Sequence, residues 1–162
     1  MTGLLLLLVL GALSGAAQPV TVFLVRHAEK AVTPEEDPSL TSAGKLRAKK
    51  LANILRDAEI AAVFTSELKR TIETAQPTAD RFKLKLTQVP AVATSELRKR
   101  ILALKGKAVL VSGHSVTVPA LIKAFGGPRD IVITESEYDR LFIMHVTSAT
   151  SATLVPLRYG LN

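Results

Sequence analysis

The chain of 162 residues contains no cysteine and no tryptophan, and aromatic residues make up 4% of it. Without cysteine the fold has no disulfide, which neither supports nor excludes an oxidising compartment. Metal binding is a poor interpretation, because only three histidines are present and no close His/Asp spacing of the usual kind occurs. The sequence therefore predicts no metal and no cofactor.

Acidic residues are in the minority, and the net charge of +7 favours anionic ligands through electrostatic steering. Nucleic acid is the obvious rival partner for such a chain. The few aromatic residues, however, form no basic stripe interleaved with rings on which bases could stack. We therefore expect a small anionic ligand and no nucleic acid.

Charge is also absent from residues 1–17, where Leu4–Leu13 forms an apolar run followed by small residues. This pattern predicts a secretory signal peptide cut near Ala17, although lysine and arginine are missing from its start. An uncleaved membrane anchor is the alternative, but the run is short against the ~20 residues that span a bilayer. We expect a periplasmic or secreted protein without stable membrane insertion, whose residues 18–162 form one domain. The sequence gives no indication of an oligomeric state.

Apolar runs of strand length alternate with segments of helical spacing along the rest of the chain. Thr41 or Ser42 is expected to cap one helix, and Thr65-Ser66 to cap another that carries Arg70 in its first turn. The expected strands are Val20–Val25, Ile60–Phe64, Leu84–Val89, Ala108–Ser112, Arg140–Thr147 and Ala152–Leu157. This alternation predicts an α/β fold, a three-layer α/β/α sandwich with a mostly parallel central sheet.

Basic side chains follow three of these strands: Arg26 and His27, then Arg70, then His114. Ligands of parallel sheets bind beyond the carboxyl ends of the strands, so we expect these side chains to meet at one edge. Two imidazoles and two guanidiniums would then surround a small volume with no acidic cluster nearby. A helix N-terminus and arginine forks both favour phosphoryl oxygens, so a phosphoryl dianion is the expected occupant.

Four segments together resemble the histidine phosphatase superfamily, which includes phosphoglycerate mutases and many small phosphatases. They are Val25-Arg26-His27-Ala28-Glu29, Leu40-Thr41-Ser42-Ala43-Gly44, residues 65–75 and Gly113-His114-Ser115. The resemblance, strongest to small bacterial phosphatases, implies the phosphoglycerate mutase-like fold and makes His27 the nucleophile that becomes phosphohistidine. It also implies that Arg26, Arg70 and His114 bind the phosphoryl oxygens and take part in catalysis.

Purely structural interpretations compete with these assignments. His27 could be a satisfied histidine at a strand end, and Arg70, taken alone, a solvated helix arginine. The third histidine, His145, falls in a late strand pattern and is expected to be structural.

The chain departs from the family where a proton donor for the leaving group is needed. Mutase-like members place a glutamate between the second and third motifs, and here Glu96 is the one acid between Arg81 and His114. The candidate general acids are thus Glu96, Glu135 and Glu137; a substrate with a good leaving group, such as phosphohistidine or an aryl phosphate, would need none.

The sequence predicts a metal-independent phosphatase that hydrolyses phosphomonoesters or phosphohistidine through His27. The alternative is a catalytically weak or inactive phosphate-binding module of the same fold. Mutase activity is not expected in so short a chain. We expect loops such as Ala31–Ser39 and Pro128–Glu137 to determine which small phosphorylated substrate binds.

Overall fold

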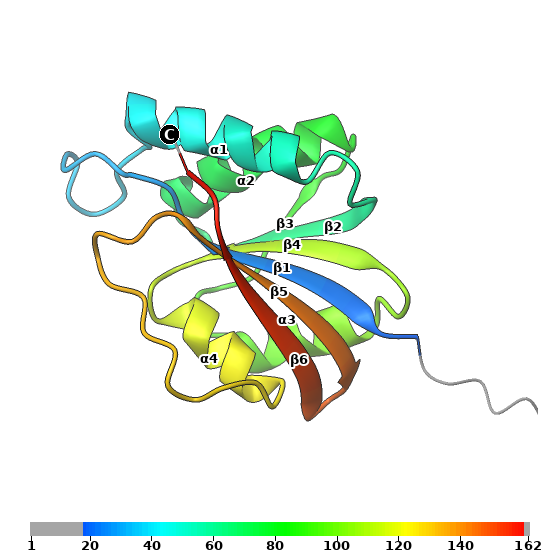
Figure 1. Cartoon of the computed structure of the whole chain (residues 1–162). Helices are drawn as coiled ribbons and strands as arrows, with labels where there is room; N and C mark the ends of the chain where they lie inside the picture. Colours follow the sequence, from blue (N-terminus) through cyan, green and yellow to red (C-terminus); the bar gives the residue numbers. More distant parts are fainter. Residues whose placement is uncertain (1–17, 161–162) are drawn as a thin grey trace, which may run out of the picture.

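A computed structural model describes residues 18–160, which form one mixed β-sheet between two helical layers (Figure 1). The strands are β1 Val20–Arg26, β2 Ile60–Thr65, β3 Leu86–Gln88, β4 Ala108–Gly113, β5 Arg140–Ser148 and β6 Ser151–Arg158. The helices are α1 Ser42–Ile54, α2 Lys69–Arg81, α3 Thr94–Leu102 and α4 Thr117–Ala124. The predicted leader, residues 1–17, lies outside the described residues, and within them no helix has the length and apolar character needed to cross a bilayer.

The strand order is β3-β2-β4-β1-β5-β6. The β2–β3, β2–β4 and β1–β4 pairs are parallel, while β5 and β6 add two antiparallel pairings at one side. The predicted fold class is confirmed: helices α1 and α2 cover one face of the sheet and α3 and α4 the other (Figure 1). The carboxyl ends of the four parallel strands therefore lie along one edge.

The central strands are buried on both faces, which explains why they appear in the sequence as continuous apolar runs. Val22 and Leu24 of β1 pack into the cluster beneath α3 and α4, whereas Val25 packs into the cluster beneath α1 and α2. Full burial of such a side chain contributes about 1.5–3 kcal/mol. The strand that ends in Arg26 is thereby held on both sides.

The two predicted helix starts had different outcomes. Thr41 caps α1 as expected, since its Oγ1 accepts a hydrogen bond from Gly44 N at 3.1 Å. The Thr65-Ser66 cap of α2 is wrong: the helix begins at Lys69 after Leu68, with no side-chain cap. Thr65 belongs to β2, and the Ser66 hydroxyl accepts from Leu68 N at 3.2 Å while also facing Thr71.

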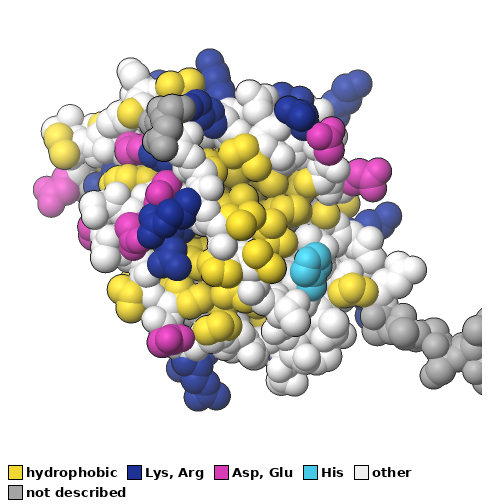
Figure 2. Space-filling model, in the orientation of Figure 1, with side chains coloured by type: hydrophobic (Ala, Val, Ile, Leu, Met, Phe, Trp, Pro, Cys, Tyr) yellow, Lys and Arg dark blue, Asp and Glu magenta, His cyan; other side chains and the backbone are white. Residues whose placement is uncertain are grey.

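Helices do not cover the whole sheet. Figure 2 shows hydrophobic side chains gathered on the face where β5 and β6 run outside the helical layer. Val155 and Leu157 of the edge strand β6 are exposed there. The helices thus enclose the parallel strands, which carry the predicted site residues, and leave the antiparallel side open.

Candidate active site

The predicted basic residues of β1 and β4 come together at the carboxyl edge of the sheet. Arg26 is the last residue of β1 and lies opposite Gly113 in the parallel register with β4. The next residue, His27, donates from its backbone N to Gly113 O at 2.8 Å. His114 follows Gly113 directly, and the centroids of the two imidazole rings are 5.6 Å apart. The register of two buried strands therefore sets the spacing of the histidine pair.

His27 is held in one tautomer. Its Nδ1 lies 2.8 Å from Ala28 O, and because a carbonyl only accepts, Nδ1 carries the proton. The lone pair of the neutral ring is then on Nε2. Burial lowers the pKa of His27 to about 4, and the positive charges of Arg26, His114 and Arg70 act in part in the same direction. At neutral pH the ring is uncharged, and an imidazole with a free Nε2 lone pair has the chemistry of a nucleophile.

The backbone beyond His27 is anchored to α2. Ala28 N donates to Thr74 Oγ1 at 2.8 Å, and Thr74 in turn donates to Arg70 O at 2.7 Å. Glu29 accepts from Arg47 of α1, with an Oε1 to Nη2 distance of 2.7 Å. Although burial acts in the opposite sense, these hydrogen bonds from Arg47 lower the pKa of Glu29. The turn after β1 is thereby fixed to both helices of one layer.

Arg26 is 2% exposed and is wrapped by the segment that precedes β5. Its Nη1 donates to Thr134 O at 2.7 Å and to Glu137 O at 3.4 Å. The ring of Tyr138 lies below the guanidinium, 4.5 Å from its carbon to the ring centroid. Arg26 Nε is buried without a hydrogen-bond partner among the described residues, so this donor remains available to an anion.

Arg70 is in the first turn of α2, as predicted, and its Nε is likewise buried without a partner within the described part of the chain. The loop Ala31–Ser39 reaches this helix end, because Asp37 Oδ1 accepts from Lys69 N at 2.9 Å. Burial lowers the pKa of His114, and the charge of Arg70 acts in the same direction. Arg26 and Arg70 thus lie close enough to His27 and His114 for their charges to lower the pKa of both imidazoles.

One of the candidate acids, Glu135, lies next to these cations. Glu135 Oε2 lies 2.5 Å from Arg26 Nη2, and its Oε1 accepts from Ser115 Oγ at 2.7 Å. The Ser115 hydrogen bond and the charge of Arg26 lower the pKa of Glu135. The sequence could not show this contact, because a loop without periodicity brings Glu135 back across the strand ends.

The other two candidate acids are engaged elsewhere. Glu137 Oε2 accepts from Thr134 N at 2.9 Å and Oε1 from Arg158 Nη2 at 2.9 Å, and these bonds lower its pKa to about 2. Glu96 lies on α3, where its Oε1 accepts from Arg100 Nε at 2.8 Å and its pKa is lowered by that bond. Among the three, Glu135 is the carboxylate that the structure joins to a site cation.

Three residues that sequence reasoning missed support the histidines. Ser66 Oγ lies 3.1 Å from His114 Nε2, and Thr117 Oγ1 accepts from His114 N at 2.8 Å. Tyr138 lies beside both Arg26 and His27, with 6.2 Å between its ring centroid and that of His27. Tyr138 is one of only two tyrosines in a chain poor in aromatic residues, which was the one signal available.

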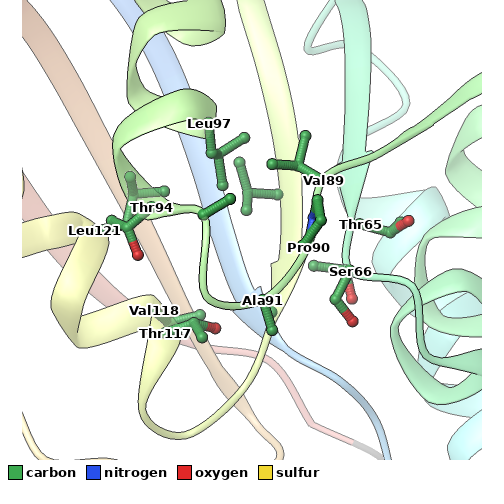
Figure 3. A pocket seen from close by; sticks show the side chains of 14 residues that line it. Thr65, Ser66, Val89, Pro90, Ala91, Thr94, Leu97, Thr117, Val118 and Leu121 are labelled. Atoms are coloured by element: carbon green, nitrogen blue, oxygen red, sulfur yellow. The ribbon is translucent and has the colours of Figure 1, made fainter.

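Ser66 and Thr117 also border a small apolar cavity of ≈ 30 Å³ between the strand ends, α3 and α4 (Figure 3). Figure 3 shows Val89, Leu97 and Val118 among its walls. This volume holds little more than a water molecule. The cavity therefore belongs to the packing behind the histidine pair.

His145 is not part of the site. It lies on β5, and its exposed Nδ1 is 3.2 Å from Thr21 Oγ1. Within residues 18–160, no three His, Cys, Asp or Glu side chains cluster in a way that could hold a metal ion.

Residues 22–99 match the family model described as the histidine phosphatase superfamily (branch 1). No curated protein sequence matches the chain. Among solved structures, a phosphoglycerate mutase from Bacillus anthracis aligns with a TM-score of 0.71 at 16% identity, covering 88% of this chain and 94% of that one.

The protein histidine phosphatase SixA, solved with tungstate, aligns with a TM-score of 0.69 at 20% identity, covering 85% of this chain and 96% of its own. An alpha-ribazole phosphatase from Shigella flexneri aligns with a TM-score of 0.66 at 16% identity, covering 86% of this chain and 96% of that one. These likenesses show the phosphoglycerate mutase-like fold over nearly the full length of each neighbour.

Proposed function

Over residues 22–99 the chain belongs to the histidine phosphatase superfamily, and on that premise we propose that it is a metal-independent phosphatase acting through His27. The observation that carries the proposal is the state of His27: buried, neutral, and with its proton fixed on Nδ1 by Ala28 O. A ring held this way presents the Nε2 lone pair beside Arg26, Arg70 and His114.

In the proposed first step, Nε2 of His27 attacks phosphorus and the bond from phosphorus to the leaving oxygen breaks. Arg26 and Arg70 hold the charge of the equatorial oxygens, and each has a buried Nε with no other partner in the described residues. Water then attacks the phosphohistidine, the P–N bond breaks, and phosphate leaves with the neutral imidazole restored. Two guanidiniums balance the dianion, so the step requires no metal charge.

His114 is the proton carrier available to this scheme. His114 Nε2 lies 3.1 Å from Ser66 Oγ, and burial and the charge of Arg70 lower the pKa of His114. A bound dianion favours protonation of His114, since opposite charge raises the pKa of an imidazole. Substrate binding would thus supply the proton that the leaving group needs.

The test is hydrolysis of an aryl phosphate with a chelator present, comparing wild type, His27→Ala and the matched control His145→Ala. We expect turnover in wild type and His145→Ala and none in His27→Ala. Acid quenching during turnover should trap acid-labile, base-stable phosphate on the wild-type chain. Loss of turnover with chelator, or its survival in His27→Ala, would overturn the mechanism.

The same experiment addresses the alternative of a phosphate-binding module. Inorganic phosphate that binds wild type without any turnover of aryl phosphate would favour that module. The retained nucleophile supports the enzyme, because binding alone does not require an imidazole with a free Nε2.

We further propose that the protein is exported, on the basis of the uncharged, apolar residues 1–17. Sequencing the N-terminus of the protein recovered from its own cells should give Gln18 as the first residue. Recovery of the intact Met1 terminus from the cytoplasm would contradict export.

A further inference from the structure

A groove runs away from the phosphoryl site between the start of α4 and the segment before β5. It has a volume of ≈ 470 Å³ and is lined by Ser115, Val116, Pro119, Ile131, Val132, Ile133, Thr134 and Glu135. Val116 is 72% exposed and Val132 69% exposed, so its walls are apolar and open to solvent. Its size is in the range of small-molecule sites.

Glu135 is the one charged residue of this lining, and it stands where the groove meets the site. One carboxylate oxygen of Glu135 accepts a hydrogen bond from Arg26 and the other accepts one from Ser115. The Glu135 side chain is 78% exposed, whereas that of Arg26 is 2% exposed. The carboxylate therefore faces both the cation that would hold the phosphoryl group and the groove that leads from it.

The position of Glu135 does not depend on its own carboxylate alone. The flanking carbonyls of Thr134 and Glu137 accept from Arg26 Nη1. The Glu135 backbone thus stays beside Arg26 when a ligand displaces the carboxylate from the guanidinium.

The charges at this junction are unbalanced for a plain phosphate ester. Arg26 and Arg70 match a phosphoryl dianion, but Glu135 adds a third negative charge next to Arg26. When phosphoryl oxygens take Arg26, the carboxylate is left beside a dianion and loses its cation. A positive charge on the leaving group, placed in the groove, would restore the balance.

We propose that Glu135 is the specificity-determining residue for the leaving group, and that the groove accepts phosphomonoesters or phosphoramidates whose leaving group is cationic. This inference rests on the proposed phosphatase function. The apolar walls formed by Val116 and Val132 suit the methyl or methylene groups that surround such a cation, and Glu135 pairs with its charge.

The test compares phosphocholine with 3,3-dimethylbutyl phosphate, which has the same shape but carbon in place of the charged nitrogen. We expect wild type to have a kcat/KM at least about tenfold higher for phosphocholine, a preference of about 1.4 kcal/mol. Glu135→Gln should bring the ratio close to one, mainly through the loss of phosphocholine turnover. The wild-type preference should also shrink as salt is raised, because the groove is open to solvent.

Asp130→Asn is the matched control, since it removes an exposed carboxylate from the same loop but outside the groove lining. It should keep the wild-type ratio. An unchanged ratio of the two kcat/KM values in Glu135→Gln would overturn the inference. An equal rise in kcat/KM for both esters would also overturn it, because it would mean that Glu135 only competes with the phosphoryl group for Arg26. Thermal unfolding of Glu135→Gln checks that its fold is intact.

Aryl phosphate separates failure of this inference from failure of the proposed function. Turnover of aryl phosphate that depends on His27, without preference between the two esters, would overturn the selectivity and leave the phosphatase standing. If no phosphate ester is turned over, the equilibrium affinities of wild type and Glu135→Gln for the same two esters still show whether Glu135 favours the cationic one. Equal affinities in wild type would then overturn the inference as well.

Discussion

Burial of His27 should make the fold less stable as the pH falls, and by a predictable amount. The pKa of His27 is about 4 in the folded protein, against 6.5 for a free histidine. The unfolded chain therefore binds a proton at His27 below pH 6.5 that the folded chain refuses until about pH 4. Stability from this residue is fully present above pH 6.5 and is lost as the pH falls to about 4.

The difference between 6.5 and about 4 corresponds to roughly 3 kcal/mol, at 1.36 kcal/mol for each pH unit. With a urea dependence of about 2 kcal/mol/M, the unfolding midpoint should fall by roughly 1.5 M between pH 7.5 and pH 4 through His27 alone. Buffers must be free of phosphate, because a bound dianion would raise the pKa of the ring.

The assay is urea unfolding of wild type and His27→Asn at both pH values. Asparagine keeps a donor near the position of Nδ1 and does not titrate, so the double difference removes the carboxylates common to both chains. His114→Asn, unfolded in parallel, separates the contribution of the second imidazole. An NMR titration of the ring protons gives the folded pKa directly.

Parallel pH profiles for wild type and His27→Asn would refute the reasoning, as would a folded pKa near 6.5. Either result would mean that water reaches the imidazole ring and that His27 is protonated at a pH near 6. The proposed nucleophile would then be charged near pH 6, and turnover should decline there as well.

Three substitutions test the surroundings of the site. Gly44→Ala would place a Cβ against the Glu29 carbonyl, and we expect a loss of about 1–3 kcal/mol by thermal unfolding; a neutral result would show that α1 shifts freely. Arg47→Leu removes the ion-pair partner of Glu29 and should lower the free energy of unfolding by about 2 kcal/mol. Arg56→Leu, which breaks the exposed pair with Asp57, should change it by no more than about 0.5 kcal/mol. Equal effects of the two substitutions would contradict the argument that burial strengthens the first pair. Arg70→Lys keeps the charge but loses the paired N–H donors of the guanidinium, so kcat/KM for aryl phosphate should fall about 10–100-fold. Unchanged kinetics would show that Arg70 does not bind the phosphoryl group.

The sheet and the histidine pair could be predicted from the sequence because both depend on buried strands. A run such as Val20–Val25 is apolar on both faces, and parallel pairing brings its end beside that of Val109–Ser112. The roles of His27 and Arg70, however, came from the family resemblance, since one basic residue after a strand has many structural explanations.

Glu135 could be named as a candidate acid, but its contact with Arg26 could not be predicted, because that contact depends on how a loop folds back. Residues 128–139 have no hydrophobic periodicity, and contacts with the Arg26 guanidinium hold the segment in place. Arg26 donates hydrogen bonds to two backbone carbonyls and to the Glu135 carboxylate, and its planar face packs on the ring of Tyr138. The start of α2 was missed for a similar reason. Ser66 has the side chain of a helix cap, but tertiary contacts with Thr71 and His114 engage its hydroxyl.

The strand order has a consequence for how the chain is made. β1 is the first strand to be synthesised, yet its two neighbours, β4 and β5, are among the last. A growing chain therefore presents the apolar segment Val20–Val25 with both of its edges unpaired until Gly113 has emerged, and with one edge unpaired until Ser148 has emerged. Such high sequence separation slows folding. The order of synthesis thus makes the strand that precedes the proposed nucleophile the first to need protection from aggregation, and it gains its second neighbour only late in synthesis.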